Sequence, residues 1–316
     1  MSNETTFTNR LAKLPVAILP TCVGAITLSN VFANPLGFPW VRHFTIWVSI
    51  IIWFCYLLKI ILCFNTCLDE YQKTVPASLY AGFTMIMMLV GAYLFDYVPW
   101  LGKGIWLIAI IIHALHILIF TYKNVLKGVN IKTFVPSWFV TYNGIMVSCV
   151  VGAPMNMPEL CSIIVYYGIA VLILIMPFMI YRLLKFPIED GFYHTRAIVL
   201  APSSLCVVSY INIISNPIPL VIYILYFIVF CCLVFVVINI KKFFSFKFHP
   251  GFAGLTFPMA IGIVASLKTG TFLTTLGFAG FGTAISQLAG FQIYMTTAII
   301  AFVLHNFYVM FSAKTH

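Results

Sequence analysis

The sequence predicts an all-α integral membrane protein. Ten transmembrane helices form five helical hairpins around a central pore, with the odd helices inside and the even helices outside. Three observations predict this fold: an extreme apolar composition, ten apolar runs of spanning length, and an alternation between two kinds of run. Of the 316 residues, 62% are hydrophobic and 8% are charged, and the mean hydropathy is +1.07. Soluble domains carry about a quarter charged residues, so the composition excludes a soluble enzyme, a disordered chain, a disulfide scaffold and a nucleic-acid binder.

The apolar runs are read as helices, because a span needs about 20 mostly apolar residues and irregular backbone cannot face lipid. They cover approximately 14–33, 41–64, 76–95, 104–122, 136–153, 159–181, 195–214, 218–239, 250–268 and 288–312. The stretch 269–290 is unusually rich in Gly and Thr. The sequence leaves open whether this stretch extends the ninth helix, loops outside the membrane or covers the pore.

The Lys and Arg residues between the runs and near their ends predict the orientation in a cell membrane, since the cytoplasmic side carries the excess of positive charge. Three of them, Arg42, Lys103 and Lys268, fall on one side. The other fourteen fall on the opposite side, which is therefore predicted to be cytoplasmic, with both termini there. They are Arg10, Lys13, Lys59, Lys73, Lys123, Lys127, Lys132, Arg182, Lys185, Arg196, Lys241, Lys242, Lys247 and Lys314.

Even and odd runs differ in composition. The even runs, such as 218–239, carry bulky side chains all round, whereas the odd runs are rich in Pro, Gly, Ser, Thr and Ala. Small residues let helices approach closely, so the odd helices should be inner and the even helices outer. The chain is then one transmembrane domain, 1–316, built from repeats at about 10–64, 74–122, 133–181, 194–240 and 249–312.

Helix-breaking positions recur in the inner helices. Pro20, Pro202 and Pro258 interrupt the first, seventh and ninth helices, and Thr84 and Thr141 fill the corresponding places in the third and fifth. These positions lie 64, 57, 61 and 56 residues apart. A period near 60 indicates an internal repeat. Because a two-helix repeat keeps its orientation, five repeats are related by rotation about the membrane normal and enclose a central pore.

The residues before the break points are apolar, so we expect them to line a dry constriction. Pro258 disfavours helical geometry at Phe257 and removes a backbone hydrogen bond, which places Phe257 at a bend. The residues before the other four break points are Leu19, Phe83, Val140 and Ala201.

The segments LPVAILPTCVG, RAIVLAPSSLCVVSYIN and GFAGLTFPMAIGIVAS resemble the tellurite-resistance and dicarboxylate transporter (TehA) family, which includes the plant guard-cell slow anion channels. The resemblance covers nearly the whole chain. It implies a homotrimer in which each protomer has its own pore, formed by five inner helices inside five outer ones. It also implies a pore-blocking phenylalanine in the ninth helix, which Phe257 of TFPMA matches. The chain departs from its relatives at Thr84 and Thr141, where they tend to carry prolines.

The expected function is passive conduction of small monovalent anions, such as chloride and nitrate, with Phe257 as the gate. The alternative is a carrier or exporter of dicarboxylate, sulfite or tellurite-type anions. No carboxylate lies deep in an expected span, which argues against a cation channel or a proton-coupled carrier. No nucleophile–base or carboxylate pair indicates an enzyme.

His113 and His116 lie three residues apart on the fourth helix, on one face, a spacing that suits a metal or a proton relay. A third ligand is missing from the sequence around them. Helix packing or a subunit interface is the favoured role, and no metal or cofactor is expected.

The charge distribution predicts that both termini and the segments around Lys127, Lys185 and Lys242 face the cytoplasm. A cysteine introduced at Lys127 should react with a membrane-impermeant thiol reagent only after the cells are opened, whereas one at Lys103 should react in intact cells. Labelling of the Lys127 position from outside would contradict the hairpin order.

Overall fold

The computed structural model describes residues 2–34 and 36–312, and in this part of the chain the backbone forms helices joined by short turns, with no β-strand. Among the described residues, eight helical segments are long and apolar enough to cross a membrane. They are Pro39–Leu62, Thr74–Phe95, Pro99–Leu126, Pro158–Lys185, Asp190–Ile213, Pro219–Ile238, Pro250–Thr275 and Ala279–Ser312. The protein is therefore an all-helical, multi-pass membrane protein.

Two of the ten expected spans differ from a long helix. The first contains α2 (Ile18–Ala33), whose 16 residues are fewer than the roughly 20 that a bilayer requires. The fifth is divided into α8 (Trp138–Tyr142), the 3₁₀ turn η2 (Gly144–Met146) and α9 (Val147–Val150). Asn143 and Gly144 favour helix poorly, and the Asn143 side chain donates a 3.0 Å hydrogen bond to the Gly168 carbonyl. The break is therefore fixed by a neighbouring helix.

The outer helices are long and regular. Four of them have a proline as their first residue. The first N–H groups of an α-helix have no carbonyl partner within the helix, so a proline there loses no hydrogen bond. The most apolar stretches of the outer helices are only 22% to 39% buried, as expected for surfaces that face lipid. These helices are α3 (Pro39–Leu62), α7 (Pro99–Thr121), α10 (Pro158–Lys185), α12 (Pro219–Ile238) and α15 (Ala279–Ser312).

The inner segments are built in pieces and are more deeply buried. In the second, fourth and fifth of them, 56%, 78% and 72% of the most apolar stretch is buried. Each joins a short helix or a 3₁₀ segment to a longer α-helix. The pairs are α5 (Thr74–Leu79) with α6 (Ala81–Phe95), η4 (Asp190–Val199) with α11 (Leu200–Ile213), and η5 (Pro250–Leu255) with α14 (Thr256–Thr275).

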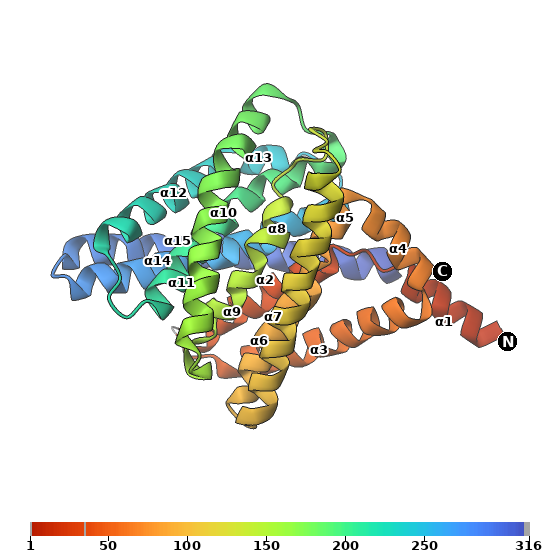
Figure 1. Cartoon of the computed structure of the whole chain (residues 1–316), viewed down its shortest axis with the longest axis horizontal. Coiled ribbons are helices and arrows are strands. Elements are labelled where there is room, and N and C mark those ends of the chain that lie inside the picture. The colour runs from red at the N-terminus through yellow and green to blue at the C-terminus, as the bar shows by residue number, and fades with distance from the viewer. Residues whose placement is uncertain (1, 35, 313–316) are drawn as a thin grey trace.

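The inner helices contact one another in a closed cycle. Helix α2 packs against α6 and α14, α6 packs against α9, and α11 packs against both α9 and α14. Each also contacts the outer helix that follows it in the chain. Figure 1 shows the outer helices following one another around the molecule, from α3 in orange through α7 in yellow and α10 in green to α12 in teal. The smaller elements are α1 (Ser2–Ala12), α4 (Phe64–Gln72), the π-helix η1 (Tyr122–Leu126), η3 (Ala153–Met155) and α13 (Ile240–Phe243).

The three inner prolines mark a change in hydrogen bonding and do not kink a continuous α-helix. Each is the third residue of its α-helix. At the first of them, Ile18 and Leu19 donate to carbonyls three residues back, whereas Thr21 donates to the carbonyl four residues back. Where the 3₁₀ pattern changes to the α pattern, the carbonyls of Val16 and Ala17 are already bonded to Leu19 and Thr21, so the backbone nitrogen at position 20 has no acceptor. Pro20 occupies that position and has no N–H to satisfy.

Glycines allow the inner helices to touch through their backbones. A Cβ atom added at Gly24 of α2 would lie 2.6 Å from the Phe257 nitrogen and 2.8 Å from the Thr256 carbonyl carbon. One added at Gly82 of α6 would lie 2.9 Å from the Pro20 nitrogen. The small residues of the odd runs thus form the contacts between inner helices, as the composition predicts.

The Gly- and Thr-rich stretch 269–290 is helical apart from one turn. Helix α14 continues to Thr275, and α15 begins at Ala279. Gly277 in the turn between them has φ of 88°, a left-handed conformation that favours glycine. The stretch therefore extends the ninth helix and begins the tenth.

Gly24→Ala should destabilise the protein, because the added methyl group meets the backbone of α14 and not a flexible side chain. The expected loss is about 1–3 kcal/mol, typical of an overpacked contact. Melting temperatures in detergent measure it. The matched control is Gly290→Ala on α15, where nothing lies within 4 Å of the added Cβ. Equal melting temperatures for the two variants would contradict the close contact between α2 and α14.

Candidate functional site

One cavity of about 300 Å³ is reached by all five inner segments. Its wall is mostly apolar, with Glu70 as its acidic side chain. In chain order the lining residues are Pro15, Val16, Ala17, Pro20, Glu70, Val75, Pro76, Leu79, Val140, Gly191, Phe192, Thr195, Ile198, Pro250, Gly251, Ala253, Gly254, Phe257 and Pro258. Most of them belong to the turns and 3₁₀ segments that precede the inner α-helices. The predicted topology assigns this end of the bundle to the cytoplasm.

Phe257 and Pro258 lie together in this wall, on the first turn of α14. The Phe257 side chain is 5% exposed and belongs to the main hydrophobic core. The hydroxyl of Thr256 donates to the Ala253 carbonyl at 2.8 Å and lies 3.4 Å from the Pro20 carbonyl oxygen. These contacts hold the start of α14 against α2.

Two further residues expected at the pore, Pro20 and Val140, also line the cavity, whereas Leu19 and Phe83 do not. Leu19 is fully buried against Gly82, and its Cβ would lie 2.9 Å from a Cβ added there. The Phe83 ring stacks on Trp53 of α3, with centroids 4.7 Å apart, and its carbonyl accepts a 3.2 Å hydrogen bond from the Trp53 indole. Phe83 therefore points towards an outer helix.

Ala201 and Pro202 are buried in α11 and are absent from the cavity wall. Thr84 is the fourth residue of α6, one place beyond the third position that the prolines occupy in their helices. Thr141 is the fourth of the five residues of α8, two places before the break at Asn143. Both threonines bond to histidines of α7.

The two histidines form a buried hydrogen-bond network. A carbonyl oxygen only accepts, so His113 Nε2 donates to the Thr141 carbonyl at 2.9 Å, and in the neutral ring Nδ1 accepts from the Thr84 hydroxyl at 2.7 Å. His116 lies 3.2 Å from the Thr141 hydroxyl through Nε2 and 2.6 Å from the Tyr71 hydroxyl through Nδ1. Burial raises the pKa of Tyr71 to about 12, so its hydroxyl stays protonated and donates.

This network joins helices of the same chain. No group of three potential ligands for a metal ion occurs among residues 2–34 and 36–312. The contacts of His113 and His116 are to inner-helix backbone and hydroxyl groups, which supports a packing role.

Sequence reasoning missed Glu70 and Lys59. Glu70 was excluded from the pathway because it lies between expected spans, yet it lines the cavity. Lys59 was counted with the solvated charges of the cytoplasmic side, yet its side chain is fully buried and its ammonium lies 2.7 Å from a Glu70 carboxylate oxygen. Lys59 stands in the apolar run YLLKIIL, and a charge inside such a run needs a partner. A buried ion pair at Lys59 could therefore have been predicted from the sequence.

On the opposite side of the predicted topology, Arg42 forms an ion pair with Asp96 at 3.0 Å. Its guanidinium also lies 5.2 Å from the centre of the Tyr93 ring. The pair joins the start of α3 to the end of α6.

Comparison with known proteins agrees with this architecture. A comparison with curated proteins gives no match. The family model described as voltage-dependent anion channel, SLAC1, matches residues 13–313, from the first inner segment to the end of the last outer helix. The chain therefore belongs to the SLAC1 family of voltage-dependent anion channels.

Proposed function

We propose that the protein conducts small monovalent anions, such as chloride and nitrate, passively through a pore in each protomer of a homotrimer. Phe257, beside Pro258, is the gate. Membership of the family indicates an anion channel or transporter. The proposal of a pore gated by Phe257 rests on the cavity with Phe257 in its wall, because all five inner segments meet there.

The proposed pore runs along the axis of five hairpins, with both termini in the cytoplasm. Helices α2 and α14 begin at the cavity, at Ile18 and Thr256. The N-terminus of a helix carries a partial positive charge, which favours an anion nearby. The start of these helices therefore supports anion over cation conduction.

Occlusion follows from the apolar character of the wall. An ion that leaves water needs replacement contacts, and an apolar passage narrowed by a phenyl ring supplies none. A ring held by packing alone can thus close the path without any charged group.

A carrier for a dicarboxylate, sulfite or tellurite-type anion is the second candidate. The cavity volume of about 300 Å³ favours it, because an anion of several atoms would fit such a space. Recording from purified protein in planar bilayers separates the two functions, since a channel gives unitary currents and a carrier gives none.

Phe257→Ala should open a permanently conducting path, because it removes the ring from the wall and enlarges the cavity. Anion current in bilayers or oocytes is expected to rise well above that of the wild-type protein. A background current from a well-folded variant would place the gate elsewhere.

The matched control is Phe252→Ala. Phe252 lies five residues earlier, in η5, is fully buried and does not line the cavity. Its loss should cost about 3–5 kcal/mol of folding free energy, as for a core phenylalanine, without opening a path. Melting temperature and current, measured on both variants, separate packing from gating.

The open variant should select anions over cations and pass nitrate at least as readily as chloride. The weaker hydration of nitrate lowers the cost of entering an apolar passage. Reversal potentials under a salt gradient measure both ratios. A reversal potential that shifts towards the cation equilibrium potential would contradict the assignment as an anion channel.

A further inference from the structure

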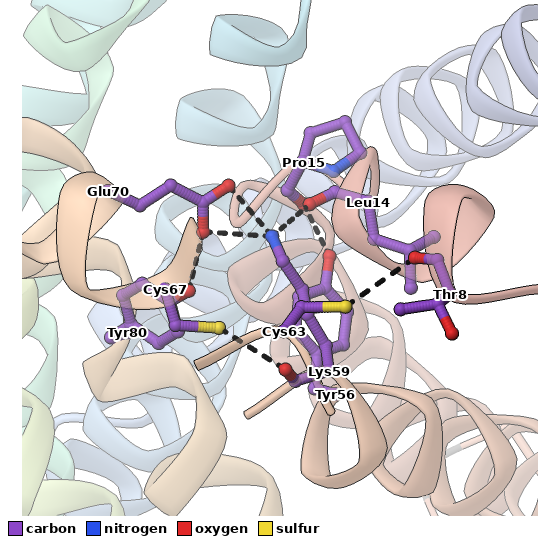
Figure 2. A network of polar contacts seen from close by, with 9 residues as sticks. All are labelled: Thr8, Leu14, Pro15, Tyr56, Lys59, Cys63, Cys67, Glu70 and Tyr80. Atoms are coloured by element: carbon purple, nitrogen blue, oxygen red, sulfur yellow. Dashed lines mark hydrogen bonds and ion pairs between the residues drawn. The ribbon is translucent and has the colours of Figure 1, made fainter. Parts of the chain in front are cut away.

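The acidic side chain of the cavity is one half of an asymmetric ion pair, shown in Figure 2. The Lys59 ammonium lies 2.7 and 2.8 Å from the two carboxylate oxygens of Glu70. The Lys59 side chain is fully buried, whereas that of Glu70 is 24% exposed and lines the cavity. The pair therefore presents its negative end to the cavity and keeps its positive end behind it.

Hydrogen bonds fix both halves in place. The third contact of the ammonium is the Leu14 carbonyl at 2.8 Å, and the Tyr80 hydroxyl donates to Glu70 Oε2 at 2.5 Å. The Tyr56 hydroxyl donates to the adjacent Pro15 carbonyl. In Figure 2 the Lys59 nitrogen is joined to Glu70 of α4 and to the Leu14 carbonyl in the turn before α2, while Tyr80, between α5 and α6, is joined to Glu70. The pair thus ties the turn before α2, the short helix α4 and the junction of α5 and α6 to the outer helix α3.

The position of the pair sets the potential that an anion meets. A carboxylate in the wall repels an anion in the cavity, and the ammonium behind it attracts the same anion. The two effects nearly cancel in the paired state. Removal of either charge alone leaves the other acting at short range, in a space that bulk water screens poorly.

We propose that Glu70 is a built-in counter-anion that limits how strongly the cavity attracts permeating anions, by neutralising Lys59. Glu70 and Lys59 are then specificity-determining residues for conduction. This inference rests on the proposed function, since it assumes that the cavity lies on the anion path.

The test uses four charge states in the conducting Phe257→Ala background: the intact pair, Glu70→Gln, Lys59→Met, and both substitutions together. Glu70→Gln should raise anion conductance at low salt by about three- to tenfold, and Lys59→Met should lower it by a similar factor. The neutral double variant should lie close to the parent. The differences should shrink at high salt, because mobile ions screen the charges.

The decisive result is that the two single substitutions change anion conductance in opposite directions. A purely structural pair predicts that both single variants lose stability and change conductance in the same direction, or leave it unchanged. Either result, in a parent that conducts, would overturn the inference and leave the proposed function standing. An open-gate parent without current would contradict the proposed function instead.

A second measurement, of nitrate binding, does not depend on conduction. Nitrate should raise the melting temperature at lower concentrations in Glu70→Gln than in the wild type, because a ligand that binds the folded state stabilises it. If the single variants do not fold, the exchange Lys59→Glu with Glu70→Lys keeps a pair and turns the ammonium towards the cavity. That exchange should also lower the nitrate concentration required. Identical nitrate titrations for every folded variant would refute the role of Glu70.

Discussion

Within the hydrocarbon of a membrane, every backbone amide and carbonyl needs a partner inside the protein, because lipid offers none. The third inner segment, with its break at Asn143, meets this constraint through side chains of the neighbouring outer helix α7. Trp106 donates to the Ser148 carbonyl at 3.1 Å, and His113 donates to the Thr141 carbonyl at 2.9 Å. A mostly apolar outer helix therefore supplies hydrogen-bond donors to the backbone of a broken inner segment.

The outer helices were predictable because their signal is composition, which needs no knowledge of neighbours. The expected run 218–239 matches α12 (Pro219–Ile238) almost residue for residue. The inner segments were harder to predict from the sequence, because hydropathy does not distinguish a 3₁₀ segment from an α-helix. Of the residues proposed for the pore, Phe257, Pro258, Pro20 and Val140 line the cavity, whereas Phe83 does not. One residue turns a side chain by about 100° around a helix, so a small register error moves it from one face to another.

Charges proved harder to place than apolar residues. Counting Lys and Arg treats each as a solvated end of a span, yet Lys59 and Arg182 are buried. Arg182 bonds through Nη1 to the Phe186 carbonyl at 2.7 Å, beyond the last turn of α10. The partner of Lys59 is eleven residues further along the chain, on α4, a helix too short and too polar to stand out in a hydropathy profile. Such pairs depend on tertiary contacts that no local pattern contains.

The prolines at the third position of α2, α11 and α14 have a mechanical consequence. Where the winding changes from 3₁₀ to α, the proline has no amide hydrogen, so a change of winding at that residue exposes no unpaired backbone donor to lipid. The turn that carries Phe257 is joined to the rest of α14 at such a place. Displacement of its ring is then opposed by side-chain packing and by the contacts of the Thr256 hydroxyl with the Ala253 and Pro20 carbonyls, whereas the backbone at Pro258 adds no hydrogen bond to that resistance.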